Sequence, residues 1–234
     1  MKRHFDADLD DLRGSLLRMG GLCEEMVQSA VKVVIERDES RLAAVQEWER
    51  QVNALHIEID DVCLRLIALH QPAAGDLRLI AAAIKINSDL ERVGDQAVNI
   101  AETGVYLCKE PKIKLGDIPR MVQVAVGMLK DSLDAFARGN VDLAREVIKR
   151  DDEEDRLKSQ TFNELVYLMQ SDASAIQRGM GIILIARNLE RIADHATNIA
   201  EDVIFMVLGK DIRHSADPHP ASGMEGADAK LKEG

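Results

Sequence analysis

The sequence predicts an all-α protein made of two tandem three-helix bundles, six helices in all. Three observations predict it: scarce aromatic rings, apolar residues at helical spacing between widely separated chain breakers, and a long motif that occurs twice. Only seven of the 234 residues are Phe, Trp or Tyr, while hydrophobic residues make up 46% of the chain. Because strands favour aromatic and β-branched residues, a chain rich in Ala, Leu, Ile, Val, Glu and Arg favours helices packed on helices.

The first half is predicted to hold helices at residues 7–37, 40–70 and 74–108. Asp38 and Ser40 are suitable caps for the second of these helices, and Pro72 lies at the edge of the third. The stretch KEPKIKLG at residues 109–116 has no helical stripe and contains Pro111, so it is predicted to link the two halves.

The second half is predicted to hold helices at residues 118–138, 141–170 and 173–208. Pro119 lies at the start of the first of them, Gly139 and Asn140 predict a turn, and Ser171 with Asp172 offers caps for the last helix. The resulting units are 5–110 and 117–212. Residues 213–234 carry little apolar bulk and are predicted to form a disordered tail.

An internal repeat supports the division into two units. LERVGDQAVNIAE at residues 90–102 recurs as LERIADHATNIAE at residues 189–201, with nine of thirteen positions identical. Upstream, EWERQVNAL at residues 47–55 aligns with KRDDEEDRL at residues 149–157. Each unit of about a hundred residues therefore matches a three-helix bundle that buries one stripe per helix.

The repeated motif places oxygen-bearing side chains on one narrow helix face. At about 100° per residue, the four side chains fall within an arc of about 80°, opposite the apolar stripe. In the first copy they are Glu91, Asp95, Asn99 and Glu102, and in the second Glu190, Asp194, Asn198 and Glu201. Carboxylates at i and i+4 repel each other, so such a face costs stability unless a cation compensates.

Three interpretations of this face remain open: a cation site, a surface for docking a partner, and the solvated side of an amphipathic helix. The stripe and the adjoining Arg92 and Arg191 are identical between the halves, whereas other polar positions have changed. A face that only meets water has no reason to keep these identities. Arg92 and Arg191 are therefore candidates for partner binding.

The compensating cation could be a metal ion or an arginine. Carboxylate and amide oxygens suit hard ions such as Mg²⁺, Mn²⁺, Ca²⁺ or iron, and a second acidic helix would complete the shell. Glu49 in the first half, and Asp151 with Asp155 in the second, are the candidate ligands from that helix. Zinc is disfavoured because the stripe holds no cysteine and His195 points away from its centre.

Composition and motifs exclude several function classes. The formal charge of −11 makes nucleic acid and anionic membrane surfaces poor direct partners. Three widely spaced cysteines, a polar N-terminus and the lack of a long apolar run predict a cytoplasmic protein. The chain has no GxxxxGK[ST], GxGxxG, GxSxG or HExxH motif and no Glu three residues before a His, so we expect no enzyme activity and no organic cofactor. A carboxylate-bundle hydrolase stays an alternative.

The duplicated motif, the loop QPAAGDLR at residues 71–78 and GKDIRH at residues 209–214 together resemble the PhoU family. The resemblance spans about residues 5–214. It implies two three-helix bundles and a negative regulator of the phosphate-starvation response that restrains a PhoR-like histidine kinase while docked to a PstB-like transporter ATPase. Membrane association would then come only through partners, and we expect a homodimer.

The resemblance also implies metal-binding motifs of the form E/D-x-x-x-D. They fall on Glu91 with Asp95, on Glu190 with Asp194, and on Asp151 with Asp155. The first half departs from this pattern because Asn53 stands where the second half has Asp155. The first site is therefore expected to bind metal more weakly. A metal-binding or metal-storage protein is the alternative function.

Overall fold

The computed structural model describes residues 4–212, and between them the chain forms six long α-helices and no strand. The predicted disordered tail, residues 213–234, lies outside the described residues. The helices of the first half are α1 (His4–Glu36), α2 (Arg41–His70) and α3 (Ala74–Cys108). Those of the second half are α4 (Ile118–Arg138), α5 (Val141–Ser171) and α6 (Ile176–Leu208). The predicted all-α fold of two tandem three-helix units is confirmed.

Local chemistry explains the turn between α4 and α5. Gly139 adopts a left-handed conformation, φ 61°, after α4, and the Asn140 side chain then accepts hydrogen bonds from the backbone N–H groups of Asp142 and Leu143 at 3.1 Å each. This asparagine cap starts α5 as predicted. The Ser40 side chain, by contrast, makes no capping bond, and the Asp38 carboxylate accepts the Ser40 backbone N–H instead.

The last helix begins three residues later than predicted. Residues Ala173–Ala175 form a short 3₁₀ turn rather than the first turn of α6. The Asp172 side chain accepts the Ser174 backbone N–H at 2.9 Å, which favours the tight turn over a regular α-helical start.

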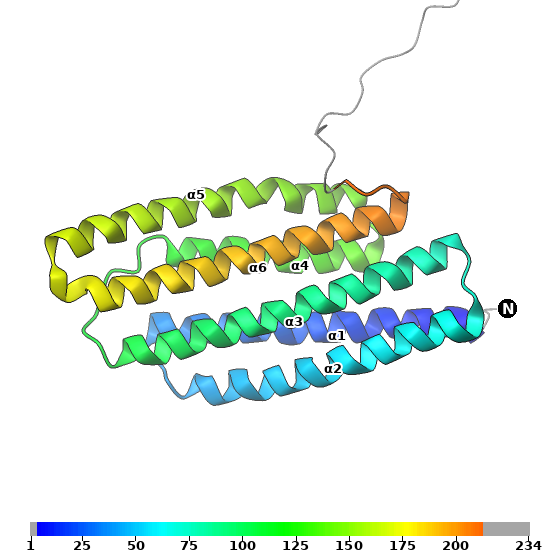
Figure 1. Cartoon of the computed structure of the whole chain (residues 1–234), viewed down its shortest axis with the longest axis horizontal. Helices are drawn as coiled ribbons and strands as arrows, with labels where there is room; N and C mark the ends of the chain where they lie inside the picture. Colours follow the sequence, from blue (N-terminus) through cyan, green and yellow to red (C-terminus); the bar gives the residue numbers. More distant parts are fainter. Residues whose placement is uncertain (1–3, 213–234) are drawn as a thin grey trace, which may run out of the picture.

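The two halves share one hydrophobic core. Figure 1 shows α3 and α6 side by side in the middle of the molecule, with α1 and α4 behind them and α2 and α5 on the outer edges. Buried residues of all six helices belong to a single continuous cluster. None of these helices is both long and apolar enough to cross a membrane.

Polar contacts fix the antiparallel register of α3 and α6. The Lys85 Nζ lies 3.0 Å from Asp202 Oδ1, and the Tyr106 hydroxyl lies 3.4 Å from Gln177 Oε1, so residues late in one helix face residues early in the other. Between them, His195 Nδ1 lies 2.8 Å from Asp89 Oδ1. These contacts join the halves along the seam where the two repeated motifs meet.

The Lys85–Asp202 ion pair makes the seam sensitive to mutation. The Asp202 side chain is 3% exposed, so Lys85→Met would remove a cation from a buried carboxylate. We expect the free energy of unfolding to fall by about 2 kcal/mol, less than for a fully buried pair because Lys85 is partly exposed. Denaturant unfolding measures the change, and Lys32→Met at an exposed position of α1 is the control. Equal stability of both variants would contradict the prediction.

Candidate functional site

The second half brings carboxylates from α5 and α6 together around one lysine. Lys158 Nζ lies 2.7 Å from Asp155 Oδ1 on its own helix and 2.7 Å from Glu190 Oε1 on α6. Asp151, one turn before Asp155, accepts a hydrogen bond from Thr197 Oγ1 of α6 at 3.2 Å. The structure thus places acidic residues of these two helices around one cation, which is the ammonium group of Lys158 and not the metal ion or arginine that the sequence suggested.

Partial burial and the repulsion of neighbouring acids raise the pKa values of Asp151 and Asp194. Burial raises the pKa of Asp194 to about 6, and the charges of Glu190, Asp151 and Asp155 add to the effect. Burial likewise raises the pKa of Asp151, although the hydrogen bond from Thr197 opposes the change. The cluster thus carries more negative charge than Lys158 alone compensates.

Glu154 is the acidic residue that the sequence reasoning missed. Its side chain is 1% exposed, and neither carboxylate oxygen has a hydrogen-bond partner in the described part of the chain. Burial, followed by the charge of neighbouring acids, raises its pKa to about 8. The sequence contained a signal that Glu154 is buried. Glu154 lies two helical turns, seven residues, after the buried Val147, and it aligns with the buried Val52 of the first half.

The first half arranges its acidic residues more loosely. Glu49, Glu91 and Asp95 are half-buried, and none forms an ion pair within residues 4–212. Asn53, the counterpart of Asp155, is exposed, as are Asn99 and Glu102. No lysine bridges the two helices here, so the two predicted sites are not equivalent.

Other predicted site residues lie apart from the acidic cluster. The Asn198 side chain donates to Asp89 of α3 at 3.2 Å, which directs it to the seam instead of the α5 carboxylates. Arg92 and Arg191 are exposed, whereas Glu201 is half-buried. His195 is 15% exposed and contacts Asp89, so it joins the two halves.

The carboxylate oxygens of the second half suit a hard metal ion, but their side chains do not surround a position for one. Within residues 4–212, no group of three or more His, Cys, Asp or Glu side chains is placed to hold a metal. Oxygen donors and the unpaired Glu154 fit such an ion chemically. Lys158 occupies the position between Asp155 and Glu190, so a metal would have to displace its ammonium group.

Fold and site define a class of protein, a duplicated three-helix bundle whose halves meet along α3 and α6 and carry carboxylates across neighbouring helices. The PhoU domain model matches residues 16–104 and 118–203, one match in each half. The chain therefore belongs to the PhoU family.

Relatives and solved structures agree with this assignment. The phosphate-specific transport system accessory protein PhoU homologue of Pseudomonas putida is 42% identical over 92% of this chain and 84% of its own length. The homologue of Clostridium acetobutylicum is 36% identical over 90% of this chain and 97% of its length. The crystal structure of PhoU from Pseudomonas aeruginosa matches with a TM-score of 0.86 at 42% identity, covering 88% of this chain and 100% of that chain.

A more distant structure has the same fold. The phosphate transport system regulatory protein PhoU from Streptococcus pneumoniae matches with a TM-score of 0.84 at 28% identity, covering 89% of this chain and 99% of that chain. The fold is therefore retained across substantial sequence divergence.

Proposed function

We propose that this chain is a cytoplasmic regulator of phosphate-specific transport and a negative regulator of the phosphate-starvation response. In this role it restrains a PhoR-like histidine kinase while docked to a PstB-like transporter ATPase, and it acts as a homodimer without catalysis of its own. The observation that carries the proposal is the 42% identity, over 92% of the chain, to a protein named as an accessory of the phosphate-specific transport system.

The architecture is consistent with an adaptor. Two similar halves joined along one seam present two related but unequal outer surfaces, α2 with α3 and α5 with α6. Unequal surfaces allow one chain to meet two different partners. The proposed partners, transporter ATPase and kinase, are two such proteins.

Gene deletion tests the proposed role. In phosphate-rich medium, we expect a phosphate-starvation reporter to be expressed at least tenfold more strongly in the deletion strain than in the wild type. A plasmid copy of the full chain should restore repression. Unchanged reporter expression after deletion would overturn the proposal.

Metal binding by the acidic clusters is a second candidate function. The uncompensated charge around Asp151, Asp155, Glu190 and Asp194 favours it, because a divalent ion would neutralise carboxylates that repel each other. Iron, Mg²⁺ and Mn²⁺ are the candidate ions. An ion that binds only the folded protein also raises its stability by mass action.

Elemental analysis separates the two predicted metal sites. Protein purified without chelator is compared with Glu91→Ala plus Asp95→Ala and with Glu190→Ala plus Asp194→Ala. We expect the second pair of substitutions to remove more metal, since the second half offers more carboxylates. Equal metal content in all three proteins would count against metal binding at these residues.

A further inference from the structure

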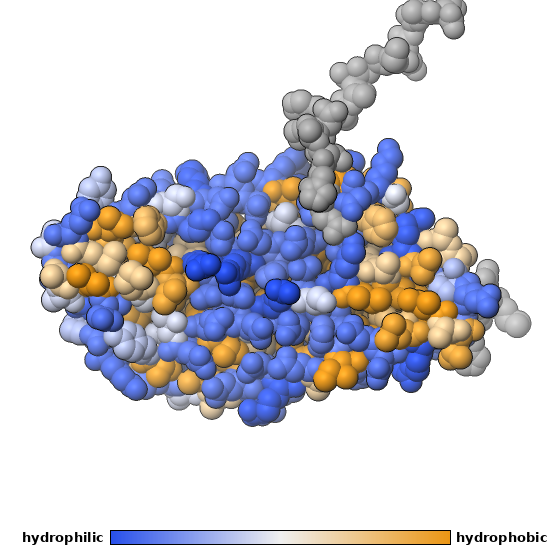
Figure 2. Space-filling view, in the orientation of Figure 1, coloured by the Kyte–Doolittle hydropathy of each residue, from blue (hydrophilic) through white to orange (hydrophobic). Residues whose placement is uncertain are grey.

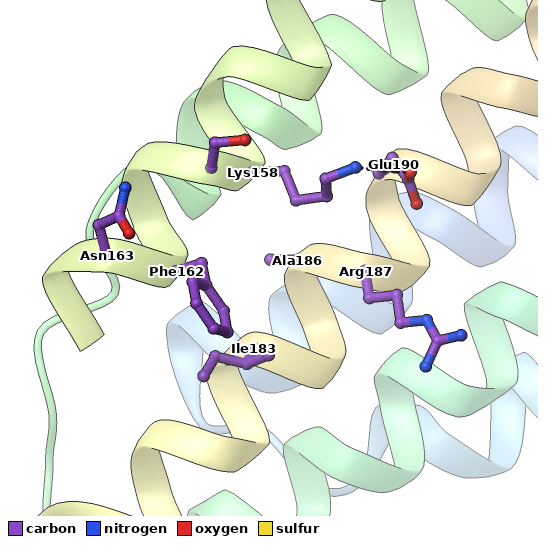
Figure 3. Close-up of a pocket in the computed structure, with 8 residues that line it drawn as sticks. Lys158, Phe162, Asn163, Ile183, Ala186, Arg187 and Glu190 are labelled. Carbon is purple, nitrogen blue, oxygen red and sulfur yellow. Dashed lines mark hydrogen bonds and ion pairs between the residues drawn. The ribbon is translucent and has the colours of Figure 1, made fainter. Parts of the chain in front are cut away.

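The second half has an open groove between α5 and α6 that continues onto an exposed apolar strip of α6. The groove has a volume of about 590 Å³ and is lined by Lys158, Ser159, Phe162, Asn163, Ile183, Ala186, Arg187 and Glu190. Figure 3 shows the Phe162 ring of α5 pointing across the groove toward Ile183 of α6, with Lys158 directed to Glu190 at one end. The walls are thus apolar in the middle and charged at that end.

An exposed strip of large apolar side chains extends the groove along α6. Ile176, Met180 and Leu184 follow at intervals of four residues and are each nearly half exposed, and Phe162 in the groove is 50% exposed. Figure 2 shows an apolar patch at this end of the molecule, over the start of α6. Apolar side chains spaced by one helical turn match the contact face of a second helix laid alongside.

The strip ends at two exposed arginines. Arg187 and Arg191 form no ion pair or hydrogen bond within residues 4–212, although acidic residues outnumber basic ones by 41 to 30 in the chain. Arg92 of α3 is also exposed and has no ion-pair partner in the described part of the chain, and the antiparallel register of the seam places it level with Arg191. Guanidinium groups without internal partners are available to carboxylates of another protein.

The first half lacks this surface. Counted 99 residues earlier, the counterparts of Met180, Leu184 and Arg187 are Ala81, Lys85 and Ser88. The counterpart of Ala186 is Asn87, whose buried side chain donates to the His56 carbonyl and to Asp60 Oδ1 at 2.9 Å each. The amide of Asn87 therefore fills the position that Ala186 leaves open in the second half.

We propose that this groove and strip dock an amphipathic helix of a partner protein, with its apolar side on Phe162, Met180 and Leu184 and acidic residues at the end that meets Arg187 and Arg191. From Ile176 to Arg191 the surface is about 22 Å long, the length of a helix of about 15 residues. The inference rests on the proposed adaptor function. It assigns one of the two proposed partners to the face formed by α5 and α6.

Photocrosslinking in the native host tests the surface directly. A photoreactive amino acid replaces Met180 in the full chain, and a matched protein carries it at Ile35, a similarly exposed apolar position of α1. We expect an adduct at position 180 with a second protein, and mass spectrometry should place the crosslink in a helix with acidic residues at one end. Arg187→Glu plus Arg191→Glu should lower the yield of the adduct roughly tenfold, as expected if the two arginines together contribute about 1.4 kcal/mol to binding.

Several outcomes would overturn the inference. They are an adduct no stronger at position 180 than at position 35, an adduct only with a second copy of this chain, a crosslink in a partner segment without acidic residues, and a yield unaffected by the arginine substitutions. A small molecule occupying the groove would give the first of these results.

Complementation separates failure of this surface from failure of the proposed function. In the deletion strain, we expect the full chain and Ile35→Glu to restore repression, whereas Met180→Glu plus Leu184→Glu should leave reporter expression at least tenfold higher than the full chain does. If the full chain itself restores nothing, the regulatory role is wrong. If all three proteins restore repression equally, the role stands and the docking surface is wrong.

Discussion

Glu154→Val should stabilise the protein by about 3 kcal/mol at pH 7, because the substitution removes a buried carboxyl group that has no hydrogen-bond partner among residues 4–212. The first half already has Val52 at this position, buried in the same way. Valine is thus compatible with the geometry of the bundle. The gain reflects the pKa of Glu154, which burial raises from 4.5 to about 8.

The expected gain depends on pH in a defined direction. Between about pH 4.5 and 8 the folded protein holds a proton on Glu154 that the unfolded chain releases. The free energy of unfolding therefore falls by about 1.4 kcal/mol for each unit of rising pH in this window. Below pH 4.5 both states are protonated and the penalty disappears, so Glu154→Val should gain most near pH 8 and least near pH 5.

Denaturant unfolding in the presence of chelator, at pH 5 and pH 8, measures this effect. Glu154→Gln keeps the size of the side chain but removes the titrating group, so it should weaken the pH dependence without the full gain of valine. Glu58→Val, at an exposed position of α2, is the control and should change little. A wild-type pH dependence that persists unchanged in Glu154→Gln would show that Glu154 is not its source.

Lys158→Met should increase the affinity for Mn²⁺ by at least tenfold. In the wild type, Lys158 Nζ lies 2.7 Å from both Asp155 Oδ1 and Glu190 Oε1 and serves as the cation of the cluster. These two bonds raise the pKa of Lys158, so the lysine stays charged and competes with a metal ion. Removing the ammonium group leaves the carboxylates free to bind the ion.

The same substitution should lower stability by about 1 kcal/mol when no metal is present, since the carboxylates then repel each other without a counterion. Isothermal titration calorimetry with MnCl₂ measures the affinity after removal of bound metal. Lys149→Met, which breaks only the exposed pair with Glu146, is the control. Equal Mn²⁺ affinity of the wild type and Lys158→Met would show that the lysine does not occupy the metal position.

The sequence was sufficient for the helices because local signals coincide at their ends. Pro72, Pro119, Gly139 and Asn140 act through the conformation of a few neighbouring residues, which does not depend on the rest of the fold. The predicted boundaries of α3 and α4 agree with the structure for this reason. The start of α6 was missed because Asp172 serves as the cap of a 3₁₀ turn, and the sequence alone does not separate the two kinds of start.

For the site, the sequence identified the repeated acidic residues through helical spacing, which places Glu190 and Asp194 on one face whatever surrounds them. It offered a metal ion or an arginine as the cation that balances them, whereas the structure places Lys158 there. The answer depends on how α5 and α6 pack, because only that packing brings Lys158 of one helix to Glu190 of the other.

What the sequence by itself determined is therefore the all-α fold, the duplication and the two acidic faces, since each follows from periodicity along one helix. Tertiary structure alone decided that Lys158 bridges α5 and α6, that Glu154 is buried with no hydrogen-bond partner among residues 4–212, and that His195 joins the halves through Asp89. These features depend on contacts between residues that are distant in the chain. Their energies come from burial and from charges brought close together, which appear only once the helices pack.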